Sequence, residues 1–172
     1  MISTNMARLI NEQINREFYS SYFYLALASQ AEGLNLKGTA AWFQAKQQEE
    51  MDHGLKMYRY LLDQDAKVAF GAIDAPPADS AGVLDMFERT LEHERDVTAS
   101  INDLVDAALS EKDHATNVFL QWFITEQIEE EATVKDIIGR LRLVGDDGRG
   151  LFMLDSELAS LAAKVSRTDT AA

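Results

Sequence analysis

The sequence predicts an all-α protein: a four-helix bundle with a long crossover between its second and third helices and a short fifth helix at the C-terminal end. Three observations predict this fold. Apolar residues recur every three or four positions over four segments of roughly 30 residues each, the period of an amphipathic helix. Only two prolines and nine glycines occur in 172 residues, so breaks between helices are few. One of those breaks is much longer than the others.

The first two helices are expected at about residues 3–31 and 37–64. Regular steps of three and four connect the residues on the inner face of the first: Ile10, Ile14, Glu17, Ser21, Tyr24, Ala28 and Ala31. The second has the heptad series Leu36, Phe43, Glu50 and Met57. Gly33 and Asn35 favour a tight turn between the two segments. The two helices should therefore form an antiparallel hairpin.

Residues 65–79 form the long break. This stretch contains Gly71 and both prolines, Pro76 and Pro77, and its composition is typical of a loop. A helix of about 30 residues is ~45 Å long, and about 14 extended residues span that distance. The loop can therefore run the length of the bundle, which would make the second and third helices parallel.

The third helix is expected at about residues 81–110, with Ser80 as its N-cap. A short turn at residues 111–114 leads into the fourth helix, at about 115–144. The glycine-rich stretch 145–150 ends that helix, and a short fifth helix follows at about 152–165. The whole chain, residues 1–172, fits a single domain.

Composition excludes several classes of function. The chain has no cysteine, which excludes disulfide frameworks, thiolate zinc sites, iron–sulfur clusters and cysteine nucleophiles. It has 29 acidic and 16 Lys or Arg residues, a formal net charge of −13. That charge argues against nucleic acid as a partner and favours cations. No apolar run resembles a secretory signal or a membrane span, so we expect a cytoplasmic protein with no membrane partner.

Each long helix carries polar, mostly acidic residues where its inner face should be apolar. They are Glu17, Glu50, Glu94, Gln127 and Glu130. A single acidic residue in such a position is more often a solvated edge than a ligand. Four at matching depth would cost several kcal/mol each if buried without a compensating charge. The conjunction therefore favours a pair of divalent metal ions in the middle of the bundle.

The second helix adds a histidine to this set. Glu50 and His53 are three residues apart, so a carboxylate and an imidazole share one helix face. This Glu-x-x-His spacing on a bundle helix is the signature of di-iron carboxylate proteins. Oxygen and imidazole ligands without sulfur suit Fe, Mn or Zn.

These motifs make the chain resemble the bacterial non-haem ferritins over nearly its whole length. The resemblance rests on Glu17 in NREFYSSYFYLAL, on EEMDH at residues 49–53, on Glu94 in LEHERD, on LQWF at 120–123 with the acidic run after it, and on LFMLDSELA. It implies the ferritin-like fold, iron storage, and a ferroxidase centre that oxidises Fe(II) to Fe(III) with O2 or H2O2. It also implies a hollow shell of 24 subunits around a ferric mineral.

The resemblance also implies a ligand set. The first iron would be held by Glu17, Glu50 and His53, and the second by Glu50 as a bridge with Glu94 and Glu130. A third iron site toward the inner surface would use Glu49, Glu126, Glu129 and Glu130. Tyr24 matches a tyrosine beside the centre, and Gln127 matches a glutamine near the second iron. Spacing alone puts Tyr24 two turns from Glu17 on one face, where it can hydrogen-bond to a ligand carboxylate, and puts Glu126, Glu129 and Glu130 on one face, where they can converge. A core tyrosine and a solvated acidic face remain the alternatives.

Several positions depart from related families. The fourth helix has Gln127 and Glu130 where bacterioferritins repeat Glu-x-x-His, so the two irons would be inequivalent. Met51 matches the haem methionine of bacterioferritins, but an isolated methionine is usually a packing residue, so haem is not expected. Carboxylates line the three-fold channel of animal ferritins at positions that correspond here to Asn117 and Leu120.

Two further residues leave open or minor roles. Trp122 is compatible with an electron relay and equally with packing in the core or at an interface. His93 points about 100° away from Glu94 on an ideal helix, so we expect it on the surface.

Two other functions remain: a di-iron or manganese oxidase acting on an organic substrate, and a bundle or shell that only buffers metal.

Overall fold

The computed structural model describes residues 2–77 and 79–168, with side chains described up to Ala163. Over this part of the chain it has five helices and no strand. The helices are α1 (Thr4–Gly33), α2 (Lys37–Asp63), α3 (Val83–Ser110), α4 (His114–Val144) and α5 (Gly148–Thr168). These bounds confirm the predicted all-α fold. No helix of the described part has the length and apolar character needed to cross a lipid bilayer.

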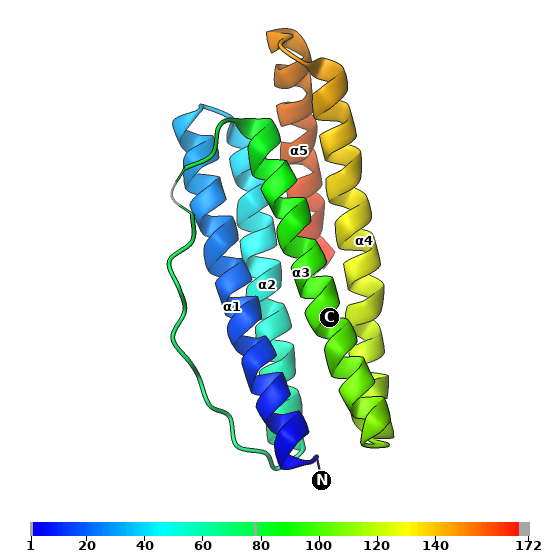
Figure 1. The fold of residues 1–172 in the computed structure, drawn as a ribbon. Helices are drawn as coiled ribbons and strands as arrows, with labels where there is room; N and C mark the ends of the chain where they lie inside the picture. The colour runs from blue at the N-terminus through cyan, green and yellow to red at the C-terminus, as the bar shows by residue number, and fades with distance from the viewer. Residues whose placement is uncertain (1, 78, 169–172) are drawn as a thin grey trace.

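The crossover also has the predicted course. In Figure 1, α1 and α2 form an antiparallel hairpin, and the long segment after α2 runs back along the whole bundle before α3 begins. Helices α2 and α3 are therefore parallel, and α4 returns antiparallel to α3. Side chains of α1 hold the crossover: Asn11 Nδ2 donates to Lys67 O at 3.0 Å, and Asn15 Nδ2 donates to Ala72 O at 2.7 Å.

The start of α3 differs from the prediction. Ser80 does not cap the helix, because the N-cap residue is Gly82, two positions later, where φ is 155°. Asp85 in the first turn accepts a hydrogen bond from the Ala81 amide at 2.9 Å instead. The Ser80 hydroxyl is buried and has no hydrogen-bond partner among the described residues.

Helix α5 begins earlier than predicted and folds back onto α2. The Asp147 carboxylate accepts from the amides of Arg149 and Gly150 at 3.1 and 3.2 Å, so it caps a helix that starts inside the glycine-rich stretch. Further along, the Asp155 carboxylate accepts from the amides of Gly38 and Thr39 at 2.9 and 2.7 Å. It thereby caps the N-terminus of α2, and α5 lies along the bundle as Figure 1 shows.

The buried apolar side chains of the described residues form two clusters, one toward each end of the bundle. The first includes Phe23, Phe43, Phe87 and Val134, with Leu154 and Leu158 of α5. The second includes Ile14, Met57, Val97, Leu120 and Phe123. Along each of the four long helices, the polar residues singled out from the sequence fall between these clusters. The core is thus divided by a polar layer at mid-height.

Candidate metal centre

The polar layer contains the ligands predicted from the sequence. All four long helices contribute, and the side chains are almost completely removed from solvent: Glu17 is 1% exposed, Glu50 2%, His53 5%, Glu94 1% and Glu130 6%. Burial of so many ionisable groups needs hydrogen bonds, protons or cations to offset the loss of hydration.

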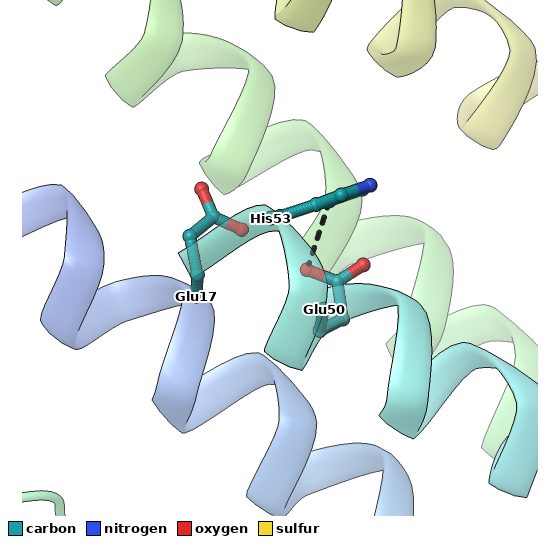
Figure 2. A group of neighbouring side chains, drawn as sticks. All are labelled: Glu17, Glu50 and His53. Atoms are coloured by element: carbon teal, nitrogen blue, oxygen red, sulfur yellow. Dashed lines mark ion pairs between the residues drawn. The ribbon is translucent and has the colours of Figure 1, made fainter. Parts of the chain in front are cut away.

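The half of the layer between α1 and α2 has the geometry of a metal site. Glu17, Glu50 and His53 each offer one ligand atom, and these three atoms lie within 4.8 Å of one another. Figure 2 shows the Glu17 carboxylate reaching from α1 toward the His53 ring, with Glu50 one helical turn away on α2. His53 Nδ1 and Glu50 Oε2 form an ion pair at 3.7 Å. Gln13 Nε2 donates to Glu17 Oε1 at 2.8 Å.

One carboxylate oxygen in this half lacks a hydrogen-bond partner within the described part of the chain. Glu17 Oε2 is buried and has no hydrogen-bond partner among the described residues. A buried carboxylate oxygen without a partner is costly. Together with the imidazole and the second carboxylate, this oxygen fits a site for a divalent cation with oxygen and nitrogen ligands.

The half between α3 and α4 is bonded differently. The Tyr24 hydroxyl donates to Glu94 Oε1, and Gln127 Nε2 donates to Glu94 Oε2 at 3.0 Å. Glu130 Oε1 accepts from the ammonium of Lys46, which reaches across from α2. Tyr24 is fully buried. Tyr24 is therefore a core residue whose hydroxyl also contacts a candidate metal ligand, so the two interpretations that the sequence left open are compatible.

The ionisation of the centre follows from burial and from these contacts. Burial and the Glu50 carboxylate raise the pKa of Glu17 well above its ordinary value. Burial and Glu50 also raise the pKa of Glu94, to about 8, and burial raises that of Glu130 to about 6 although Lys46 opposes it. At neutral pH the metal-free centre therefore holds a proton on Glu94, and burial disfavours the ionised form of Glu17.

Glu50 and His53 shift in the opposite sense to those acids. Burial alone would raise the pKa of Glu50, but His53 and Lys46 outweigh it and lower the pKa to about 2. Burial would lower the pKa of His53, but Glu50 and Glu17 outweigh it and raise the pKa to about 9. Glu50 is thus an anion and His53 a cation until a metal ion replaces the proton of the imidazole.

The predicted third site is only partly assembled. Glu49, His53 and Glu126 form a second group of three potential ligands, again with ligand atoms within 4.8 Å of one another. Glu126 is half-buried, whereas Glu129 is exposed and belongs to no such group among the described residues. Glu130 has its Oε1 engaged by Lys46.

Sequence reasoning missed Lys46 and misplaced His93. Lys46 precedes Glu50 by four positions and His53 by seven, so the helical period that identified those two residues also places Lys46 on the same face. His93 is half-buried rather than on the open surface. The side of α3 that it occupies faces α1, where its Nε2 lies 2.8 Å from Ser20 Oγ and its ring centroid 4.6 Å from that of Phe23.

Three residues outside the ligand set also have defined places. Trp122 packs edge-on against His53, with ring centroids 5.3 Å apart, and Lys56 Nζ lies 3.8 Å from the centre of the indole. Leu120 is fully buried in the second apolar cluster, so it cannot line a channel between subunits. Met51 is half-buried on α2.

Comparisons with known proteins agree with this geometry. A family model described as a ferritin-like domain matches residues 7–144. The bacterial non-heme ferritin of Campylobacter jejuni is 39% identical over 162 residues, covering 94% of this chain and 97% of the relative. A probable bacterial non-heme ferritin-like protein of Haemophilus influenzae is 38% identical over 164 residues, covering 95% and 99%.

Solved structures give the same result. The open-pore ferritin of the archaeon Archaeoglobus fulgidus superposes with a TM-score of 0.92 at 43% sequence identity, covering 92% of this chain and 98% of that one. An engineered closed form of the same ferritin gives a TM-score of 0.91. The family match, the relatives and the four-helix bundle with its central carboxylates together show that this chain belongs to the ferritin family.

Proposed function

We propose that this ferritin stores iron and oxidises Fe(II) to Fe(III) at a di-iron centre in the middle of each subunit. The observation that carries the proposal is the group formed by Glu17, Glu50 and His53, whose three ligand atoms lie within 4.8 Å of one another, together with the unpartnered buried Oε2 of Glu17. Iron is the substrate of this centre and the cargo of the protein.

Each residue of the centre has a part in this reaction. Glu17, Glu50 and His53 would bind the first Fe(II), and Glu50, Glu94 and Glu130 the second. Each iron gives up one electron, so two irons together reduce O2 to H2O2 with two protons, or H2O2 to water, without releasing a radical. The anionic oxygen ligands stabilise Fe(III) more than Fe(II), which favours oxidation.

Protons leave the centre as iron enters it. In the metal-free state the raised pKa values keep Glu94 and His53 protonated at neutral pH, and burial raises the pKa of Glu17 as well. A divalent cation replaces those protons, because it stabilises the ionised carboxylates and needs the lone pair of the imidazole. Tyr24 and Gln127 would hold Glu94 in place during the exchange, since both donate hydrogen bonds to its carboxylate.

The oxidised iron would move to an internal cavity and accumulate there as a ferric mineral. We propose a cytoplasmic shell of 24 subunits, which would have a mass of about 460 kDa for subunits of 19.2 kDa. A net charge of −13 on each subunit would concentrate Fe(II) around the shell. Size-exclusion chromatography with mass measurement tests the assembly directly. A monomer or dimer would contradict it.

Replacement of the bridging ligand tests the centre. The variant Glu50→Ala should assemble but lose rapid Fe(II) oxidation, because it removes a ligand that both irons share. The measurement is oxygen uptake after aerobic addition of Fe(II), followed by electron microscopy for an iron core. Glu92→Ala is the matched control, since Glu92 is an exposed glutamate on α3. Oxidation by Glu50→Ala at the wild-type rate would overturn the assignment of the site.

A further inference from the structure

Lys46 places a buried ammonium group in the polar layer. Its side chain extends from α2 and is only 4% exposed. The ammonium forms two ion pairs with carboxylates, one with Glu49 Oε2 at 2.5 Å on its own helix and one with Glu130 Oε1 on α4. Lysine side chains are almost never fully buried unless they are paired, and this one is paired with two carboxylates.

The two carboxylates keep this ammonium charged. Burial alone would lower the pKa of Lys46, but Glu130 and Glu49 outweigh burial and raise it. Lys46 therefore places an ammonium, held by two carboxylates, in the wall of the centre. It supplies to Glu130 and Glu49 the compensation that a metal ion supplies elsewhere in such a site.

The ammonium of Lys46 lies where a third metal ion would be expected to bind. Glu49 and Glu130 are two of the four carboxylates expected to hold a third iron. An ammonium hydrogen-bonded to an oxygen of each of them competes directly with a divalent cation for those oxygens. The group formed by Glu49, His53 and Glu126 is the other candidate for a third metal, but the first iron takes the His53 imidazole and the ammonium holds Glu49 Oε2. Glu126 is half-buried, and Glu129 is exposed and belongs to no group of potential ligands among the described residues.

We propose that Lys46 is a built-in counter-ion that fills the third metal position, so that each subunit binds two metal ions at its centre rather than three. The proposal rests on the proposed two-iron centre and specifies its stoichiometry. Lys46 stands three residues before Glu49 on the same helix, so the tether keeps the ammonium within reach of both carboxylates. Glu130 keeps its second oxygen for the second iron.

Metal stoichiometry tests the proposal without relying on catalysis. Assembled, metal-free protein is titrated with Co(II) under anaerobic conditions, and bound ions per subunit are counted by calorimetry and by the visible absorption of Co(II). The wild type should bind two. Lys46→Gln removes the charge while leaving a side chain of similar reach, and it should bind three. Lys56→Gln removes one charge from the same helix but touches neither Glu49 nor Glu130, and it should bind two.

The outcomes separate this proposal from the proposed function. Three ions in the wild type, or two in Lys46→Gln, would overturn the role of Lys46 and leave the two-iron centre standing. No binding to the wild type would overturn both. If Lys46→Gln does not assemble, anomalous diffraction from wild-type crystals soaked in Co(II) decides the question. Two peaks with Lys46 still in contact with Glu130 support the proposal, and a third peak beside Glu49 and Glu126 contradicts it.

Discussion

The buried carboxylates in the two halves of the polar layer are compensated by different contacts. Between α1 and α2, Glu17 has an oxygen with no partner among the described residues and faces the Glu50–His53 pair. Between α3 and α4, Glu94 already accepts hydrogen bonds from Tyr24 and Gln127, and Glu130 is paired with Lys46. The first half has bonding capacity left for a metal ion, whereas the second is largely satisfied without one.

This difference indicates an order of metal binding. A cation entering the first half gains the unpartnered oxygen of Glu17 and displaces the proton of His53. A cation entering the second half must compete with hydrogen bonds from the protein itself. We therefore expect the first half to bind metal more tightly, with the second filling only after Glu50 has been drawn toward the first ion.

The largest expected effect comes from removing a ligand from each half in turn. His53→Ala should weaken the tight site by more than about 100-fold, since changes to residues that only support a metal ligand already cost 10–100-fold. Glu94→Ala should leave that site intact and abolish only the weaker one. Anaerobic titration with Co(II) distinguishes the two variants. Equal losses at both sites in both variants would contradict the order of binding.

Tyr24→Phe is a smaller change that touches only the second half. It removes the hydroxyl that donates to Glu94 while keeping the ring buried among Phe23 and Phe43. We expect the weaker site to lose roughly tenfold in affinity and the tighter site to be unchanged. Tyr22→Phe is the matched control, because Tyr22 is exposed. A purely structural role would lower the melting temperature without separating the two affinities.

These expectations also show what the sequence could reveal. The helical period located Glu17, Glu50, Glu94 and Glu130 because four acids at one depth of an apolar core have no structural purpose. The same period would have placed Lys46, but lysine is usually solvated and drew no attention. Neither the pairing of Lys46 with Glu130 nor the packing of His93 against α1 could be predicted from one helix, because both depend on which neighbouring helix lies opposite.

The free energy of unfolding of the metal-free protein should depend on pH through the carboxyl group of Glu94, which lies in the second half. The pKa of Glu94 is raised to about 8, so the folded metal-free protein retains a proton that the unfolded chain releases near 4.5. Stability from this proton is complete below pH 4.5 and is lost as the pH rises to about 8, by at most ~1.4 kcal/mol per pH unit. Glu94→Gln, which stays neutral, should flatten this dependence. Melting temperatures in the presence of a chelator measure the slope.

His53 adds to the same trend from the first half, over a higher pH range. Its pKa is raised to about 9, so its contribution is complete below pH 6.5 and is lost toward pH 9. Metal binding should show the reverse dependence, strengthening as the pH rises, because each bound cation replaces protons. A metal affinity independent of pH between 6 and 9 would contradict the protonation assigned to the empty centre.

The smallest expected effect tests whether the first half depends on its own supporting hydrogen bond. Gln13 Nε2 donates to Glu17 Oε1 at 2.8 Å and opposes the rise in the pKa of Glu17 that burial causes. Gln13→Leu removes this hydrogen bond and leaves a buried oxygen without a partner, which costs about 1–3 kcal/mol. A bound metal ion should recover part of that loss by taking over the orientation of Glu17. We therefore expect a decrease of only several-fold in the affinity of the tight site, smaller than the effect of Tyr24→Phe on the weak one. A larger effect from Gln13→Leu would mean that metal binding in the first half depends on supporting hydrogen bonds as much as binding in the second. Any difference in metal affinity between the halves would then come from their ligands alone.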